Sequence, residues 1–271
     1  MRNLLAALLL LPILGAKAQS TPTLALPLEQ GHSHNDYWRP HPLRDALQLG
    51  FKSVEADIFL MGGTSLLVGH DSVSLRPEKT LQAVYLEPLR LLLRQQKTLY
   101  ARPSQLWLYL DFKNAGPATY ARLRGVLAEY RDILSTPEHP RADGVKVILS
   151  GGYPRPQVLA DTHRLVYLDG SLADLQPTAS PTSIPTVNGN WQKCFTWKGD
   201  GPMPAAEAAQ LRLWSEQAQR NGQKIRFWNL PATNPNHLQA LWRELLRYPA
   251  LLVGADELDY LKETIERQVK S

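Results

Sequence analysis

Cysteine is nearly absent from this chain of 271 residues, which has a single one, Cys194. A lone cysteine cannot form a disulfide within the chain, so we expect the fold to depend on a buried core rather than on cross-links. We interpret Cys194 as a small apolar packing residue, with a reactive thiol or an intermolecular bridge as the alternatives.

Two further absences narrow the range of functions. The sequence has no G-x-S-x-G segment, which argues against a serine hydrolase with an exposed nucleophile elbow. It also has no run of positive charge: the formal net charge is +5, but the lysines and arginines are scattered. Scattered charge excludes a nucleic-acid-binding footprint, while the weak positive excess is compatible with an anionic substrate.

The N-terminal residues 1–18 have the pattern of an export signal. Arg2 is followed by the apolar run Leu4–Leu14 and by Ala16-Lys17-Ala18, which is an A-x-A cleavage pattern. The run is short for a membrane span, so we predict cleavage, with an uncleaved anchor as the alternative. The mature chain, 19–271, would have a net charge of +3 and no membrane span. We expect it to be a monomer exported to the periplasm or to the medium.

Predicted strands and helices alternate along the mature chain, and no internal linker divides it. Strands are expected over residues 28–33, 51–59, 106–113, 145–149, 165–168, 186–188, 224–228 and 251–253, with a short additional strand over 66–68. Helices are expected over residues 43–49, 80–96, 117–134, 156–160, 205–220, 237–246 and 256–268. This alternation favours a single (β/α)₈ TIM barrel, a fold of the α/β class.

Reactive side chains gather in the first third of the chain. Glu55 and Asp57 lie two residues apart on a predicted strand, so both carboxylates point to one face and can hold one cation. Ligands that are all oxygens suit a hard ion, Mg²⁺ or Ca²⁺. His34 and His70 end neighbouring segments, and two imidazoles can act as base and acid in one turnover. This combination indicates phosphoryl chemistry.

The polar residues of the predicted strands favour one end of the barrel. Those at or just past a carboxyl end are His34, Asp57, His70, Asp111, Lys113, Asp169 and Asn229. Barrel enzymes build their active sites at this rim, so we expect a site there.

The run His32-Ser33-His34-Asn35-Asp36-Tyr37-Trp38-Arg39 resembles the yeast altered-inheritance-of-mitochondria family, member six, and its bacterial relatives. This family is similar to the phosphatidylinositol-phospholipase-C-like phosphodiesterases, which include glycerophosphodiester phosphodiesterases and sphingomyelinase D. The resemblance spans nearly the whole mature chain. It implies that residues 19–271 form one TIM-barrel phosphodiesterase domain with one divalent cation, Mg²⁺ or Ca²⁺.

The resemblance also implies roles for the histidines. His34 matches the first catalytic histidine, with His32 as a less favoured candidate, and His70, followed by Asp71, matches the second. We expect His34 to act as the base and His70 as the acid. The blander interpretations are that His32 is structural and that His70 makes only a loop hydrogen bond with Asp71.

The metal ligands implied by the resemblance are Glu55, Asp57 and Asp111. Lys113, two residues after Asp111, matches the family lysine and would contact the substrate phosphate. The aspartate at position 111 is as in sphingomyelinase D, where glycerophosphodiesterases generally have glutamate. A mutual salt bridge between Asp111 and Lys113 is the structural alternative.

Other positions depart from the glycerophosphodiesterase pattern. The chain lacks its His-Arg-Gly and Pro-Glu-Asn motifs, so the arginine that holds the phosphate must be replaced, by Arg39 or by Lys113. Trp228 and Asn229 match a Trp-x-Asn-like tip of the seventh strand and are further candidates for substrate binding, although Asn229 could serve only to close a turn.

We therefore predict a metal-dependent phosphodiesterase that acts on a glycerophosphodiester or a phospholipid-like headgroup, by hydrolysis or through a cyclic phosphate. Two alternatives stay open. The barrel could be a binding protein whose chemistry has decayed, because fold alone does not determine function. It could also be a glycosidase that uses a pair of carboxylates.

Overall fold

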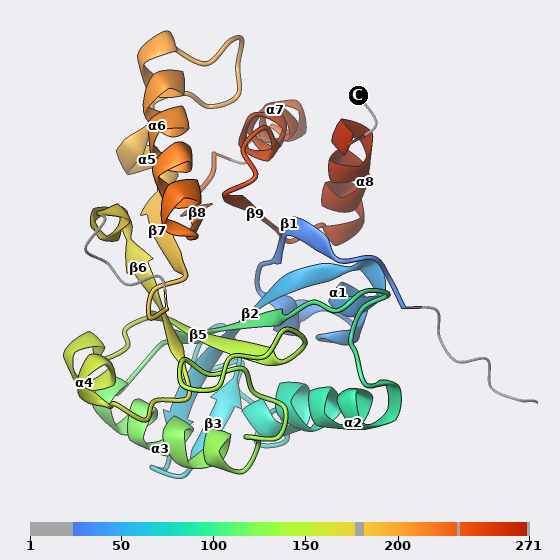
Figure 1. Cartoon of the computed structure of the whole chain (residues 1–271), viewed down its shortest axis with the longest axis vertical. Helices are drawn as coiled ribbons and strands as arrows, with labels where there is room; N and C mark the ends of the chain where they lie inside the picture. Colours follow the sequence, from blue (N-terminus) through green and yellow to red (C-terminus); the bar gives the residue numbers. More distant parts are fainter. Residues whose placement is uncertain (1–23, 177–181, 232–233, 270–271) are drawn as a thin grey trace, which may run out of the picture.

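The fold is a closed parallel barrel surrounded by helices, as a computed structural model of residues 24–176, 182–231 and 234–269 shows (Figure 1). Among these residues the barrel strands are β1 (Leu28–Ser33), β2 (Phe51–Met61), β4 (Leu106–Phe112), β5 (Val145–Gly151), β6 (Tyr167–Ser171), β7 (Thr186–Asn190), β8 (Lys224–Trp228) and β9 (Leu251–Ala255). The strand β9 pairs with β1, which in turn pairs with β2, so the sheet closes on itself. The predicted TIM barrel is thereby confirmed.

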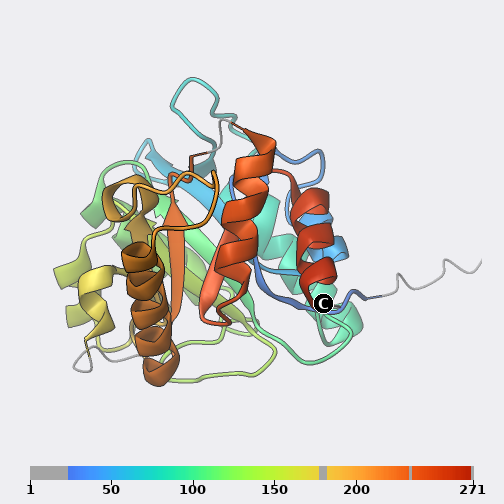
Figure 2. The ribbon, with the colours of Figure 1, turned by 90° about the horizontal axis from the view of Figure 1, so that it is seen from above.

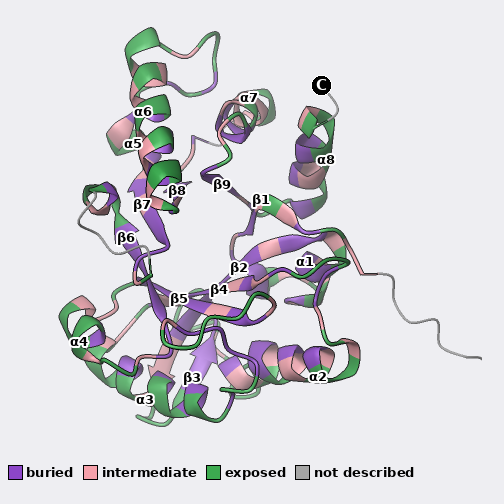
Figure 3. Ribbon diagram, in the orientation of Figure 1, coloured by how far each residue is buried: buried purple, intermediate pink, exposed green. Residues whose placement is uncertain are grey.

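Helices cover the outside of the barrel (Figures 1 and 2). They are α1 (Arg44–Leu49), α2 (Glu87–Gln96), α3 (Gly116–Ala128), α4 (Arg155–Ala160), α5 (Trp191–Cys194), α6 (Ala205–Asn221), α7 (Pro235–Leu246) and α8 (Leu258–Val269). Their buried faces meet the sheet and their exposed faces point outward (Figure 3). None of the described helices is both long and apolar enough to cross a membrane. The predicted signal segment lies outside the described residues.

Alternation along β2 divides its side chains between two environments. Val54, Ala56 and Ile58 are fully buried in the main hydrophobic core between strands and helices. The alternate residues Glu55 and Asp57 are also buried, but they belong to the opposite face. The strand therefore carries its carboxylates toward the inside of the barrel while its apolar residues hold the helices.

The interior of the barrel contains a second, smaller apolar cluster. Tyr109, Ile148, Tyr167 and Leu252 pack together there, one from each of four strands. This layer fills the barrel beneath the polar residues that approach the carboxyl rim. The barrel is thus a packed core with polar groups at one end, not a pore.

The short strand β3 (Ser65–Val68) pairs antiparallel with the end of β2, with Ile58 opposite Val68. The main-chain N–H of Gly69 then donates to the carbonyl oxygen of Asp57 at 3.2 Å. This hairpin returns the chain to the rim, so that His70 lies beside the carboxylate of Asp57.

Several helices and strands begin or end at residues other than those predicted. The helix expected over 80–96 begins with a π-helical turn, Gln82–Leu86, and the hydroxyl of Thr80 accepts the N–H of Ala83 at 3.1 Å. The helix expected over 117–134 ends at Ala128. Strand β6 starts two residues later than predicted, because the preceding residues are buried but do not pair with a neighbouring strand.

Candidate active site

Three carboxylates converge at the rim of the barrel. In the parallel register of β2 and β4, Asp57 lies directly opposite Asp111, and Glu55 points to the same interior. One oxygen from each of these residues lies within 4.8 Å of the others. Burial raises the pKa of Asp111, and the charges of Glu55 and Asp57 raise it further. Such a cluster of oxygens fits a hard divalent cation, because the cation would relieve the repulsion among the acids.

Lys113 already neutralises part of this negative charge. Its Nζ lies 3.2 Å from Asp57 Oδ2 and 3.2 Å from Asp111 Oδ1. The predicted salt bridge between Asp111 and Lys113 is therefore present, and Asp57 shares it. Because Lys113 also lines the cavity described below, its ammonium group is accessible to an anionic ligand as well.

A polar cavity of about 390 Å³ opens above the carboxylates. Its lining among the described residues is His34, Glu55, Asp111, Lys113, Ser150, Gly151, Asn188, Arg226 and Trp228. We call it the polar cavity. Two cations and two carboxylates face the same small volume, which is an environment suited to a phosphate held between a metal ion and basic side chains.

His34 stands at the edge of the polar cavity. Its Nδ1 lies 2.9 Å from Asp256 Oδ1, and Asp256 follows β9 directly. Burial alone would lower the pKa of His34, but the hydrogen bond with Asp256 and the charges of Glu55 and Asp256 outweigh burial, so its pKa is raised. Because Asp256 occupies Nδ1, the other ring nitrogen is left for a substrate.

His70 approaches the carboxylates from the other side. Its Nδ1 lies 3.4 Å from Asp57 Oδ2 and 3.2 Å from the hydroxyl of Tyr37. The ring packs beside Trp38, with 5.0 Å between ring centroids. His70 is outside the lining of the polar cavity, in contrast to His34, so the two histidines flank the acidic cluster instead of sharing one wall.

His32 is fully buried and cannot reach solvent. Its Nε2 lies 2.8 Å from Glu55 Oε2, and its Nδ1 lies 2.6 Å from Ser53 Oγ. Burial lowers its pKa to about 4, so the ring is neutral at neutral pH. A neutral ring donates one N–H to the carboxylate of Glu55 and accepts the hydroxyl proton of Ser53, which orients Glu55.

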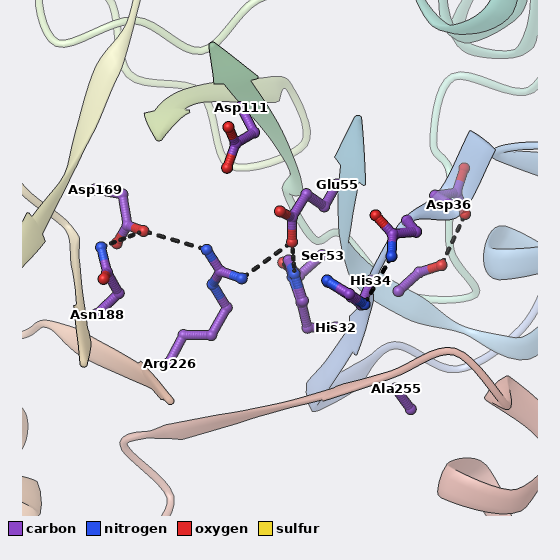
Figure 4. Close-up of polar contacts among 12 residues, drawn as sticks. His32, His34, Asp36, Ser53, Glu55, Asp111, Asp169, Asn188, Arg226 and Ala255 are labelled. Atoms are coloured by element: carbon purple, nitrogen blue, oxygen red, sulfur yellow. Dashed lines mark hydrogen bonds and ion pairs between the residues drawn. The ribbon is translucent and has the colours of Figure 1, made fainter. Parts of the chain in front are cut away.

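Arg226 is the functional residue that sequence reasoning missed. Its guanidinium is buried between two acids, with NH1 3.0 Å from Glu55 Oε2 and NH2 3.5 Å from Asp169 Oδ2 (Figure 4). Burial alone would raise the pKa of Glu55, but Arg226 and the hydrogen bond from His32 hold it well below its usual range.

A signal for Arg226 was present in the sequence. The residue occupies the centre of β8, where Ile225 and Phe227 alternate with it. Alternation therefore predicts a charged side chain inside the barrel, where only a functional or paired cation is tolerated. Arg226 lines the polar cavity, so it joins Lys113 as a candidate for the role of the missing arginine.

Asp169 is anchored by the neighbouring strand β7. The hydroxyl of Thr186 donates to its Oδ1 at 2.8 Å, and the side-chain amide of Asn188 donates to its Oδ2 at 3.0 Å. The register of β6 and β7 places Asp169 opposite Thr186, so these contacts follow from the strand pairing. Asp169 holds Arg226 from the side away from Glu55.

Arg39 does not fit the phosphate-binding role predicted for it. Its guanidinium donates to the main-chain carbonyls of His34 at 3.1 Å and Ala255 at 3.4 Å, and it lies outside the lining of the polar cavity. Arg39 is close to His34 in sequence, but the sequence does not show that its guanidinium binds main-chain carbonyls.

Trp228 and Asn229, at the tip of β8, have side chains in different surroundings. The indole of Trp228 lines the polar cavity and donates to Asn188 Oδ1 at 3.2 Å. Asn229 adopts a left-handed conformation, with φ of 57°, and its side-chain amide donates to Asn190 Oδ1 at 3.2 Å. Trp228 is thus available to a ligand in the polar cavity, whereas Asn229 is absent from that lining and instead lines the neighbouring cavity between β8, β9, α7 and α8.

Comparisons with known proteins agree with this architecture. Residues 25–169 match the model of the AIM6-like phosphodiesterase domain. The chain is 30% identical over 263 residues to the altered inheritance of mitochondria protein 6 homolog of Arthroderma benhamiae, covering 85% of this chain and 82% of that one. It is also 30% identical over 267 residues to altered inheritance of mitochondria protein 6 of Eremothecium gossypii, covering 86% and 68%.

A solved structure shares the fold. The crystal structure of a glycerophosphodiester phosphodiesterase from Agrobacterium tumefaciens superposes with a TM-score of 0.50 and 15% identity, covering 88% of this chain and all of that one. At this identity the likeness concerns the fold alone.

The predicted export is wrong. The relatives are named for altered inheritance of mitochondria, which points to a role related to mitochondria and not to an exported protein. The pattern of residues 1–18 led to the error, because a short apolar segment after a basic residue is not specific to export.

Proposed function

The chain belongs to the AIM6-like phosphodiesterase family, and on that premise we propose that its barrel cleaves phosphodiester bonds at the carboxyl rim. One observation carries the proposal: three acids from two adjacent strands come within 4.8 Å of one another beside two buried or half-buried cations and a histidine. Such a set matches the needs of a phosphate diester, which brings negative charge to a metal site.

Glu55, Asp57 and Asp111 would hold one divalent cation, Mg²⁺ or Ca²⁺. When bound, the cation supplies Lewis acidity that polarises a phosphoryl oxygen. Arg226 and Lys113 also line the polar cavity, where they would hold phosphate oxygens. Arg226 offers a planar fork and Lys113 a point charge, so the two orient the phosphate differently.

The two histidines move the protons. His34 takes a proton from the attacking hydroxyl, and the carboxylate of Asp256 stabilises the resulting imidazolium. The attacking oxygen forms a bond to phosphorus as the bond to the leaving oxygen breaks. His70 gives its proton to that leaving alkoxide. With water as the attacker the product is a monoester; with a hydroxyl of the substrate it is a cyclic phosphate.

Hydrolysis of bis(p-nitrophenyl) phosphate by the whole chain, with Mg²⁺ or Ca²⁺ added, tests the proposal. We expect turnover that stops in excess chelator and returns when the cation is restored. His34→Ala should lower kcat by about 10²- to 10⁴-fold, because it removes one proton transfer. His70→Ala should cause a loss of the same size on a diester with an alkyl leaving group, because an alkoxide needs a proton to leave whereas p-nitrophenolate does not. His41→Ala is the matched control, since this histidine is exposed and pairs only with Asp45.

Other outcomes would support one of the two alternative functions. Hydrolysis of a p-nitrophenyl glycoside that survives chelation and the loss of His70 would favour a carboxylate-based glycosidase. Binding of phosphate without turnover of any diester would mean a barrel whose chemistry has decayed. Sedimentation of the same samples tests the expected monomer.

A further inference from the structure

A second cavity adjoins the polar cavity. It has a volume of about 530 Å³ and lies between the ends of β8 and β9 and the helices α7 and α8, which pack against each other. Its lining includes the apolar side chains Phe227, Trp228, Leu230, Leu238, Trp242 and Tyr260. We call it the apolar cavity. Figure 2 shows α7 and α8 side by side along this part of the barrel.

The two cavities share a boundary. His34 and Trp228 line both of them. The two cavities therefore meet at these two side chains, so a molecule with its phosphate beside His34 has the apolar cavity as its immediate neighbour. The volume is within the range of cavities that hold small organic ligands, about 300 to 1,000 Å³.

The charges of the two cavities differ in a way that orients such a molecule. Lys113 and Arg226 line the polar cavity, whereas no lysine or arginine occurs among the described residues that line the apolar one. The apolar cavity instead includes Asp256 and Glu257, which would repel a phosphate. The phosphate therefore belongs in the polar cavity, and an uncharged group belongs beside it.

Trp242 contributes ring surface to the apolar cavity. The ring packs against Tyr260, with 5.4 Å between centroids. Its indole N–H is buried and closed off from the cavity, so a ligand meets only the apolar ring atoms of this side chain.

We propose that the apolar cavity binds a hydrophobic substituent of the phosphodiester substrate, an alkyl, acyl or aryl group attached next to the phosphate that His34 faces. This inference rests on the proposed function and adds the class of substrate: a diester of at least one apolar alcohol. A diester with two small polar alcohols would leave the apolar cavity filled with water.

Binding of alkyl phosphates by the full chain tests this inference without depending on turnover. Methyl, butyl, hexyl and octyl phosphate, each below its micelle concentration and with Mg²⁺ present, are titrated by calorimetry. Burial of each added methylene should lower Kd about fourfold until the cavity is full. A Kd that stays the same from methyl to octyl would overturn the inference, even if bis(p-nitrophenyl) phosphate is hydrolysed.

Two variants locate the effect. Leu238→Asp puts a charge into the apolar cavity and Leu238→Trp fills it, so both should reduce the ratio of methyl to hexyl Kd at least tenfold. Leu213→Asp is the matched control, because Leu213 is exposed on α6 and lies outside the lining. An unchanged ratio in both Leu238 variants would place the alkyl chain elsewhere and overturn the assignment.

A pair of ligands of equal shape separates neutral from cationic groups. The probes are 3,3-dimethylbutyl phosphate and its analogue 2-(trimethylammonio)ethyl phosphate. We expect the neutral compound to bind at least as tightly. Tighter binding of the cation, through the aromatic rings and the carboxylates of Asp256 and Glu257, would overturn the assignment to a neutral group.

Discussion

At the scale of single residues, the buried guanidinium of Arg226 decides how the acids of the barrel are held. It bridges Glu55 and Asp169, and its charge compensates both buried carboxylates. Removing one member of such a group leaves buried charges unpaired, which costs far more than the loss of an exposed ion pair. Arg226 should therefore affect stability and phosphate binding together.

Arg226→Met tests the stability part. We expect the free energy of unfolding to fall by about 3 to 5 kcal/mol, because Glu55 and Asp169 lose their shared cation. Arg247→Met is the control: Arg247 pairs with Glu244 on the surface, and its loss should cost at most about 1 kcal/mol. Urea denaturation measures both, and equal midpoints for the two variants would contradict the bridging role.

The pair of His34 and Asp256 predicts a pH dependence. The folded-state pKa of His34 is raised, so this group stabilises the fold fully below its unfolded pKa, about 6.5, and the contribution is lost as pH rises through the raised value. Asp256→Asn should lower the pKa of His34 and, with His34 as base, move the acidic limb of kcat to lower pH.

Histidine NMR titration measures this shift directly. Asp45→Asn, which removes the partner of His41, is the matched control and should leave the titration of His34 unchanged. If Asp256→Asn leaves the His34 resonance and the pH profile where they were, Asp256 does not hold the ring.

At the scale of elements, strand ends and the turns after them place the ligands. Asp111 is the last residue but one of β4, and its carboxylate lies beside Gly151, the last residue of β5, which adopts φ of 69°. A Cβ at position 151 would overlap the carboxylate of Asp111. Glycine is therefore needed at position 151 for two reasons: the backbone conformation, and the space that the carboxylate of Asp111 occupies.

Gly151→Ala should weaken binding of Mg²⁺ or Ca²⁺ at least tenfold, because the carboxylate of Asp111 must move away from Glu55 and Asp57. Gly62→Ala is a matched control: Gly62 also has positive φ, 56°, but a Cβ there meets nothing within 4 Å. Both variants carry the backbone cost, so calorimetric titration of the cation isolates the clash. Equal affinities would show that Asp111 is not a ligand.

At the scale of the whole molecule, the pairing of β2 with β4 brings together acids that are distant in sequence, and Lys113 and Arg226 offset only part of their repulsion. The raised pKa of Asp111 means that the folded chain disfavours its charge. Stability and metal binding should therefore respond in opposite directions when this charge is removed.

Thermal unfolding with and without a divalent cation tests this opposition. Metal at 100 times Kd should stabilise the wild-type chain by about 2.7 kcal/mol, and excess chelator should remove the gain. Asp111→Asn should unfold at a higher temperature than wild type in chelator but gain little from metal. Asp143→Asn, on an exposed loop, is the control for an aspartate outside the cluster. A full response to metal in Asp111→Asn would remove this residue from the site.

The sequence by itself determined the strands, the barrel and the positions of Glu55, Asp57, Asp111 and the two histidines, because alternation and strand ends are local properties. Only the tertiary structure decided which cationic side chain compensates the charge of these acids. Arg226 reaches Glu55 and Asp169 across the barrel, and Arg39, which is near His34 in sequence, binds main-chain carbonyls instead. Contacts across a closed barrel depend on strand register and burial, which no short stretch of sequence contains.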